Sequence, residues 1–238
     1  HISNDELSEY LEKYDKKINS INPGGSIANT IFAAADNGAK TFFSFAIGDD
    51  EYGELFTKSF RDRESISFKK TEYRTGVCLI FVTPDGNRTM AANLGANTQL
   101  NSDCLDFEQL RNAEFLVFDN FTLSAISNFD DLKFLYECPA EIKICFGVSD
   151  VNLVDENLDL LDKLFQLKLF LIYGNIEEIR ALQKKLQFDT ENILQSEGEN
   201  GAMFNQLKVN APDIISVNTN GAGDALVGTF LAKYKELS

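Results

Sequence analysis

The chain has 238 residues, of which 44% are hydrophobic and 25% are charged, as in an ordinary folded domain. Its formal net charge of -15 repels phosphate backbones and anionic lipid, so we expect neither nucleic acid nor a membrane as a partner. The single histidine is His1, which removes histidine-based hydrolysis, metal binding and general-base chemistry and leaves carboxylates, thiols or lysines for such work.

The first half of the chain alternates helix and strand patterns. It predicts a small-residue helix over residues 28–37, closed by Gly38, and then a strand over residues 41–47. A short helix over residues 52–60 and a two-stranded hairpin of residues 76–83 and 88–93 follow. The Pro, Asp and Gly of residues 83–87 predict the turn of that hairpin. Residues 61–71 are charged and patternless, which leaves a loop or an omitted segment as open alternatives.

The second half predicts a parallel sheet. Short continuous apolar runs at residues 115–118, 142–148 and 167–173 suit strands that are covered on both faces. Helical patterns lie between and after them, over residues 156–165, 176–186 and from near Gly221 to the last residue. This order predicts an α/β fold, in which ligands bind beyond the carboxyl ends of the strands.

The four cysteines form no CxxC pair, and two of them, Cys78 and Cys145, lie in apolar runs. We therefore expect buried, reduced thiols. No stretch of about 18 apolar residues is present, and the first residues do not resemble a signal peptide. Together these observations favour a cytoplasmic protein.

The sharpest motif is Asn-Thr-Asn-Gly-Ala-Gly-Asp over residues 218–224, between a β-like run at residues 213–217 and the last helix. Gly221 and Gly223 allow successive backbone N–H groups to point one way, and the helix N-terminus adds positive potential, so the loop predicts an anion cradle. Asp224 then has two interpretations. It stabilises the first helical turn, or it accepts the proton of a hydroxyl that attacks a phosphoryl group held by the cradle. The lysine of a Walker A loop and the spacing of a Rossmann fingerprint are both absent.

Residues 218–230, NTNGAGDALVGTF, resemble the second signature of the ribokinase-like (PfkB) carbohydrate kinase family, D-T-x-G-A-G-D. The resemblance implies that Asp224 is the catalytic base, that Gly221, Ala222 and Gly223 form the anion hole, and that Thr219 borders ATP. It also implies a three-layer α/β/α core with a mostly parallel sheet and a small β lid. Position 218 departs from the family pattern, because asparagine replaces the aspartate of a region that helps to bind a monovalent cation; potassium dependence is therefore left open.

A glycine pair precedes the first clear helix in Gly-Gly-Ser-Ile-Ala-Asn, residues 24–29. By its residue types, Ser26 is the predicted N-cap of that helix, and Asn29 lies one turn inside, where its amide could face a ligand. The segment resembles the first PfkB signature, G-G-x-x-x-N, which implies that Gly24, Gly25 and Asn29 bind the acceptor substrate. The next match, Gly48 to Gly53, resembles the family's G-x-D-x-x-G element, in which we interpret Asp49 as a loop and cap residue.

Two further matches concern the nucleotide. Asn175 and Glu178 follow the third apolar run; they read either as an ordinary helix cap or as the family's NxxE element, which implies Mg²⁺ ordered mainly through water. The turn at residues 196–201 resembles the family's T-x-G-x-x-G turn, which implies that Ser196 and Gly198, with Asn175, border ATP. In the hairpin, Arg88 either contacts the phosphates when the lid closes or is simply solvated.

The matches run in family order and predict a kinase core over residues 24–65 and 94–238, with lid segments at 1–23 and 66–93. The family's first core strand and its C-terminal helices have no counterpart, so we expect a longer protein. The predicted activity is ATP- and Mg²⁺-dependent phosphorylation of a hydroxyl on a sugar or nucleoside, similar to the adenosine-kinase-like branch. Alternatives left open are a sugar-phosphate kinase and a catalytically weak regulatory protein that binds nucleotide or sugar. The expected partner is a small molecule, and pairing of lid edges into a homodimer is also left open.

Overall fold

Six strands form the main sheet of the computed structural model, which describes residues 1–60, 64–85, 87–126, 132, 135, 138–188, 190, 192–213 and 219–237. Their order across the sheet is β10-β9-β8-β7-β6-β5. The parallel strands are β5 (Phe115–Asp119), β6 (Lys143–Gly147), β7 (Leu171–Asn175) and β8 (Ile193–Ser196). The hairpin of β9 (Ala202–Phe204) and β10 (Leu207–Val209) continues the sheet antiparallel. The predicted apolar runs thus contribute adjacent parallel strands, although β7 begins only at Leu171, inside the run at residues 167–173, and extends beyond it to Asn175.

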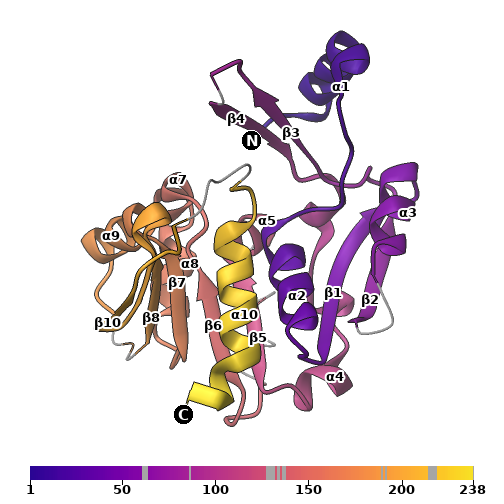
Figure 1. The fold of residues 1–238 in the computed structure, drawn as a ribbon. Coiled ribbons are helices and arrows are strands. Elements are labelled where there is room, and N and C mark those ends of the chain that lie inside the picture. The colour runs from indigo at the N-terminus through magenta and orange to yellow at the C-terminus, as the bar shows by residue number, and fades with distance from the viewer. Residues whose placement is uncertain are drawn as a thin grey trace.

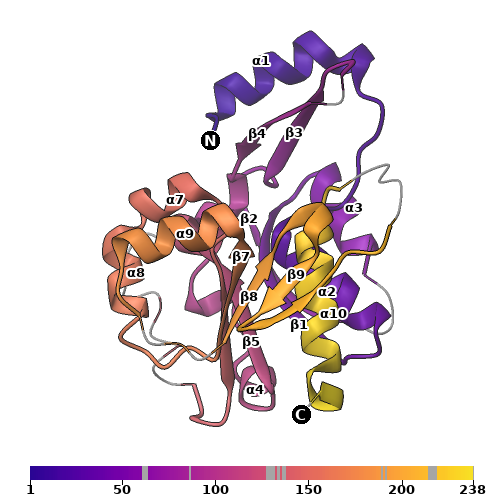
Figure 2. The same ribbon diagram turned by 60° about the vertical axis from the view of Figure 1, so that its left-hand side comes forward.

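Helices cover both faces of this sheet (Figures 1 and 2). On one face, Leu123, Val154, Leu161 and Ile179 pack in the larger core cluster. They come from α5 (Asn120–Ala125), α7 (Val151–Glu156), α8 (Leu158–Leu164) and α9 (Ile176–Lys185). On the other face, Val227 and Leu231 of α10 (Ala222–Leu237) pack on Cys145, Leu171 and Tyr173. The arrangement is the expected three-layer α/β/α core.

Helix α2 (Ser26–Asp36) lies beside α10, although the two are far apart in sequence (Figures 1 and 2). A Cβ on Gly228 would lie 2.2 Å from the carbonyl oxygen of Thr30, so the close approach of the helices requires a glycine there. At the C-cap of α2, Asn37 Nδ2 donates to Thr229 Oγ1 at 3.1 Å. This pairing brings the two glycine motifs of the sequence to one place.

A separate parallel pair consists of β1 (Thr41–Gly48) and β2 (Glu64–Thr71). The second of these strands shows that residues 64–71 are not a loop, which corrects that interpretation; residues 61–63 lie outside the described residues. Lys69 and Lys70 lie on a strand that pairs only with β1 among the described strands, and charged residues are common on such edges. The strand also crosses the boundary expected at residue 66. Helix α4 (Phe107–Arg111) follows later in the chain, and 3₁₀ turns span residues Asp15–Lys17, Gly95–Gln99, Ser102–Cys104 and Gly198–Asn200.

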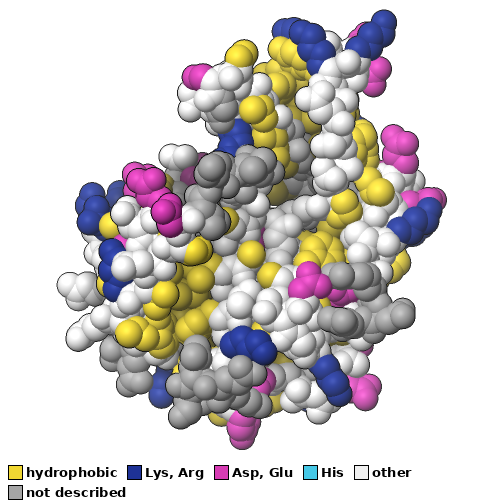
Figure 3. Space-filling view, viewed as in Figure 1, with side chains coloured by type: hydrophobic (Ala, Val, Ile, Leu, Met, Phe, Trp, Pro, Cys, Tyr) yellow, Lys and Arg dark blue, Asp and Glu magenta, His cyan; other side chains and the backbone are white. Residues whose placement is uncertain are grey.

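The hairpin of β3 (Val77–Val82) and β4 (Arg88–Asn93) stands between α1 (Asn4–Tyr14) and the rest of the molecule (Figures 1 and 2). Phe81 packs against Tyr10 and Tyr14 of α1, with ring centroids 5.7 and 5.4 Å apart. Side chains on the hairpin face that points away from α1 are exposed, including Ile80 at 43%. Hydrophobic side chains are correspondingly visible on the surface of this upper part of the molecule (Figure 3).

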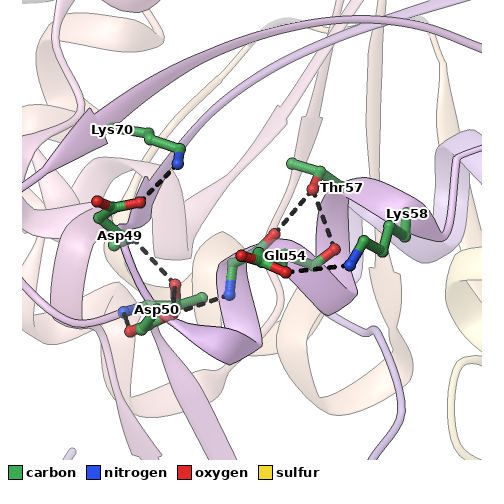
Figure 4. Close-up of polar contacts among 9 residues, drawn as sticks. Asp49, Asp50, Glu54, Thr57, Lys58 and Lys70 are labelled. Atoms are coloured by element: carbon green, nitrogen blue, oxygen red, sulfur yellow. Dashed lines mark hydrogen bonds and ion pairs between the residues drawn. The ribbon is translucent and has the colours of Figure 1, made fainter.

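The start of α3 (Glu51–Lys58) corrects the interpretation of Asp49 as a cap. The cap is Asp50, whose carboxylate accepts bonds from the backbone N–H of Gly53 at 2.8 Å and of Thr75 at 2.7 Å. These bonds lower the pKa of Asp50 against the opposing effect of burial. Asp49 instead forms an exposed ion pair with Lys70, at 2.6 Å (Figure 4).

All four cysteines are free, as expected, but their burial differs. Cys104 and Cys145 are buried and Cys138 is half-buried, whereas Cys78 is exposed on β3, so the expected burial of Cys78 is wrong. The physical reason is alternation, because Cys78 faces away from the α1 side of a two-stranded hairpin. Among the described residues, no helix is both long and apolar enough to cross a membrane.

Candidate active site

The glycine loop leads directly into α10. Gly221 has φ 73°, which is strained for any residue with a side chain, and Ala225 N donates to its carbonyl at 2.8 Å. The N–H of Ala222 donates to the carbonyl of Thr219 at 3.2 Å, so the turn already uses one of the predicted anion-hole donors. Other N–H groups of the first turn of a helix lack intrahelical partners. The predicted strand at residues 214–217 and Asn218 lie outside the described residues.

Asp224 lies in the first turn of α10 and is bound by the start of α2. Ser26 Oγ donates to Asp224 Oδ1 at 2.8 Å, and Asn29 Nδ2 donates to Asp224 Oδ2 at 2.9 Å. The carboxylate therefore lies near the N-termini of two helices, where their partial positive charge stabilises an anion. The predicted base and the predicted acceptor-binding asparagine are in direct contact.

Ser26 does not cap α2, which corrects that prediction. The N-cap is Gly25, whose φ of 109° few residues with a side chain can adopt, and no side chain caps the helix. A Cβ on Gly24 or on Gly25 would meet no atom within 4 Å. The space beside both glycines is thus open, next to Asn29 and Asp224.

A buried acid, Asp119, lies near this site and was not found from the sequence. Asp119 is 2% exposed, caps α5 and accepts bonds from the N–H and Oγ1 of Thr122, both at 2.9 Å. Burial raises the pKa of this carboxyl, the negative charge of Asp224 raises it further, and the bonds from Thr122 oppose the rise. Its place directly after an apolar strand was the available signal, since polar groups there reach the ligand edge of the sheet.

Asp119, Gly147 and Tyr173 form one row across β5, β6 and β7. A Cβ on Gly147 would lie 2.6 Å from the Tyr173 ring, so this ring fills the space above the glycine. The ring therefore lies beside the same row of residues as Asp119. The buried hydroxyl of Tyr173 has no hydrogen-bond partner among the described residues. Burial raises the pKa of Tyr173 well above its usual range, and the charges of Asp119 and Asp224 raise it further.

Asn175 and Glu178 form a complete capping box at the start of α9. Asn175 Oδ1 accepts from the N–H of Glu177 and of Glu178 at 2.9 Å, and the Glu178 carboxylate accepts from the N–H and side chain of Asn175 at 2.9 and 2.6 Å. Burial raises the pKa of Glu178, and the charges of Asp150 and Asp224 add to the rise. The cap interpretation of this pair is confirmed; its part in metal binding stays a prediction.

The residues expected to border the nucleotide lie on adjacent strands. Ser196 at the end of β8 pairs in register with Asn175 at the end of β7. Gly198 follows with φ 59°, and Glu197 between them forms an ion pair with Lys208 at 2.7 Å. The structure therefore brings Ser196 and Gly198 to the same sheet edge as Asn175.

Arg88 bridges from the hairpin to the glycine loop. Its Nη2 donates to Thr219 Oγ1 at 2.5 Å and its Nη1 donates to Asn220 Oδ1. The side chain is exposed but is not simply solvated. It lies beside the start of α10, where an anion would bind.

The side chains of the site show what kind of metal binding they could support. Among the described residues, no group of three or more His, Cys, Asp or Glu side chains is arranged to hold a metal ion. The side chains of Asn175 and Glu178 already bond to each other. A Mg²⁺ ion that keeps most of its waters and binds substrate phosphates fits such a site, because it needs few direct protein ligands.

Together these groups supply a carboxylate beside an open space, helix N-termini and a cation, which suit transfer of a phosphoryl group to a hydroxyl. Residues 5–236 match the family model of the pfkB family carbohydrate kinases, and the chain belongs to that family. It is thus a kinase of the phosphotransferase class that acts on alcohol groups.

Individual proteins agree with this assignment. A fructokinase from Solanum tuberosum is 26% identical over 242 residues, covering 89% of this chain and 71% of that protein. The crystal structure of a probable sugar kinase from Rhizobium etli has a TM-score of 0.83 at 24% identity, covering 96% of this chain and 76% of the other. Adenosine kinase from Sinorhizobium meliloti has a TM-score of 0.83 at 21% identity, covering 99% and 77%. The expected ribokinase-like α/β/α fold is confirmed.

Proposed function

We propose that the protein transfers the terminal phosphoryl group of ATP to a hydroxyl of a small sugar or nucleoside, with Asp224 as the general base. The observation that carries the proposal is the contact of Asp224 with Asn29 and Ser26 beside the loop of Gly221. A carboxylate that lies next to both an open space and a helix N-terminus can take a proton from a hydroxyl that attacks a phosphate.

The acceptor side is assigned to Gly24, Gly25 and Asn29. The open space beside the glycines would admit a hydroxylated ring close to the backbone. As the acceptor oxygen forms its bond to phosphorus, its O–H bond breaks, the proton passes to Asp224, and ADP leaves with the electrons of the broken P–O bond. Asn29 orients the acceptor through its amide while it bonds to Asp224.

The phosphate side is assigned to the first turn of α10 and to Arg88. The backbone N–H groups of Gly221 and Gly223 and the Arg88 guanidinium would stabilise charge on the transferring group. Thr219, Ser196 and Gly198 would border the nucleotide. A Mg²⁺ ion near Asn175 and Glu178 would neutralise phosphate charge when bound, held mainly through water.

The hairpin face that carries Arg88 indicates which kind of acceptor the site would favour. Arg88 lies opposite Val82, and Met90 lies opposite Ile80, so these side chains share one face. Val82 and Met90 are 64% and 58% exposed. Because Arg88 on this face contacts the glycine loop, closure over the site would place apolar side chains against the acceptor. This favours an acceptor with a flat apolar ring, such as a nucleoside.

A hexose acceptor is the second candidate, because the curated relative from Solanum tuberosum is a fructokinase. A panel of acceptors separates the two. ADP release with Mg-ATP would be measured for adenosine, other nucleosides, ribose, fructose and fructose 1-phosphate. We expect turnover that is highest for a nucleoside, and a loss of about 10²–10⁴-fold in kcat for Asp224→Asn. Nucleotide binding without turnover on any acceptor would contradict the proposal and favour a regulatory protein.

A further inference from the structure

Ser26 is the first residue of α2 and lies directly after the N-cap position, where a serine hydroxyl would serve the helix. A serine at the start of a helix most often accepts a backbone N–H bond as the N-cap. Here α2 begins at Ser26, and the cap is Gly25, without any side-chain bond. The hydroxyl donates to Asp224 instead, across 198 residues of sequence. This use of the hydroxyl suggests a role beyond helix stability.

The two donors from α2 fix both oxygens of the Asp224 carboxylate. Ser26 and Asn29 are three residues apart, on one face of the helix, and each bonds to a different oxygen, at 2.8 and 2.9 Å. A carboxylate bound at both oxygens cannot rotate about its Cβ–Cγ bond without breaking one of these contacts. Each oxygen keeps a further lone pair for an incoming proton.

We propose that Ser26 is a positioning residue that holds the Asp224 carboxylate in the orientation required to receive the acceptor's proton. The inference rests on the proposed function of Asp224. Ser26 keeps its own proton throughout: the acceptor O–H bond breaks, the new O–P bond forms, and the transferred proton ends on Asp224. The serine hydroxyl acts only through the carboxylate and does not contact the acceptor.

Removal of this hydroxyl should therefore separate turnover from binding. We expect Ser26→Ala to lower kcat about tenfold, because small misplacements of a reacting group reduce rates by one or two orders of magnitude. The KM values for acceptor and ATP should change less than twofold. Ser26→Thr retains the hydroxyl and should recover kcat to within about threefold. If the alanine variant fails to fold, Ser26→Cys offers the same comparison, since a thiol is a weak donor.

A matched control exists in the same helix pair. Thr229→Val removes the Asn37–Thr229 hydrogen bond, which also joins α2 to α10 but lies between the C-cap of α2 and the middle of α10. If Ser26 merely tethers the two helices, both variants should lower the melting temperature. Their effects on kcat should then be alike, with kcat lowered in both variants or in neither. We expect a loss of kcat for Ser26→Ala alone.

Three outcomes would overturn the inference: an unchanged kcat in Ser26→Ala, a raised acceptor KM at constant kcat, or an equal loss of kcat in Thr229→Val. A crystal structure of Ser26→Ala gives a readout besides activity, and we expect the Asp224 carboxylate to be rotated from its wild-type position. If the wild type phosphorylates no acceptor, the proposed function fails, and an unrotated carboxylate would then overturn the positioning role as well. A rotated carboxylate in an inactive protein would uphold the positioning and refute the kinase.

Discussion

Asp224 and Glu178 are both acids in the first turn of a helix, yet their partners differ. Among the described residues, the Glu178 carboxylate bonds only to Asn175, three residues away, and closes a capping box. The Asp224 carboxylate bonds to Ser26 and Asn29, which are 198 and 195 residues away on another helix. Local partners indicate a helix cap, whereas partners from distant segments indicate an assembled site. The sequence motif alone does not separate the two cases, because both acids suit a helix N-terminus.

The glycine at residue 221 offers the strongest way to break the Asp224 arrangement without altering its carboxylate. Gly221→Ala would force a side chain into φ 73° and place a Cβ 3.3 Å from Asn29 Nδ2. We expect kcat to fall about 100-fold, since the Asn29–Asp224 bond is displaced. Stability should fall by about 1–2 kcal/mol because of the left-handed backbone. Steady-state kinetics and thermal unfolding measure both effects.

Gly223→Ala is the control for this loop. A Cβ there would meet no atom within 4 Å, and alanine is favoured over glycine within a helix by roughly 0.5–1 kcal/mol. The melting temperature should stay constant or rise, and kcat should stay within about tenfold of wild type. Equal losses in the two variants would contradict the importance of the Gly221 conformation.

Arg88 extends the comparison to the hairpin, since its partners Thr219 and Asn220 are also distant in sequence. Arg88→Ala removes hydrogen bonds to a charged group, each worth about 1.5–3 kcal/mol where it forms. We expect kcat/KM for ATP to fall about tenfold, as the charge beside the phosphate site is lost. Lys70→Ala breaks only an exposed ion pair with Asp49 and should change this ratio less than twofold. Similar ratios for the two variants would show that Arg88 is only a surface contact.

The Glu178→Gln variant tests whether Glu178 does more than cap α9. Glutamine has one oxygen acceptor, so it can keep the bond from the Asn175 N–H but loses the bond from the Asn175 side chain. The melting temperature should therefore fall by no more than a few degrees. If Glu178 also orders Mg²⁺ through water, the Mg²⁺ concentration for half-maximal rate should rise about fivefold, because the charge is lost. Glu177→Gln removes the same charge from the same turn outside the box, and should leave the Mg²⁺ dependence unchanged. An unchanged Mg²⁺ dependence in Glu178→Gln would show that Glu178 serves only as a helix cap.

The smallest expected effect concerns Asp119. Burial raises its folded pKa above the ordinary value of 3.8, so the native state binds this proton more tightly than the unfolded chain. The resulting stability is fully present below pH 3.8 and is lost as pH rises through the folded pKa. Asp119→Asn cannot ionise, so its melting temperature should exceed that of wild type by a few degrees at pH 8 and by less as pH falls. A pH-independent difference between Asp119→Asn and wild type would contradict the explanation.

Much of the fold could be predicted because its signals are local. The apolar runs gave β5 to β7, and the Pro, Asp and Gly turn gave the hairpin of β3 and β4. Several shorter elements were missed, and β2 and α1 show two different reasons. Strand β2 carries charges on an edge, which hides its pattern, and α1 begins with a capping box of Ser3 and Glu6 that is visible in the sequence.

The candidate site was predicted where a motif carried it and missed where only tertiary contact reveals it. The contact of Asn29 with Asp224 agrees with the two glycine motifs, which mark both ends of the pair. Ser26 does not have its expected capping role, because α2 begins at Ser26 itself and its hydroxyl bonds to a partner 198 residues away. The place of Asp119 after an apolar run marks it as a polar group at the sheet edge, but its nearness to Asp224 required knowledge of which strand ends meet α10. Such information lies in the order of strands, not in the pattern of any one segment.

The pairing of α2 with α10 also has a consequence for how the protein is made. Synthesis proceeds from the N-terminus, so Ser26 and Asn29 emerge long before Asp224, and loop closure over nearly 200 residues must precede their contact. Contacts of such high sequence separation form slowly relative to helices and hairpins. Phosphoryl transfer is therefore among the last properties that a newly made or refolding chain acquires. A partly made chain that already has its central strands would lack Asp224, the proposed base, beside Ser26 and Asn29.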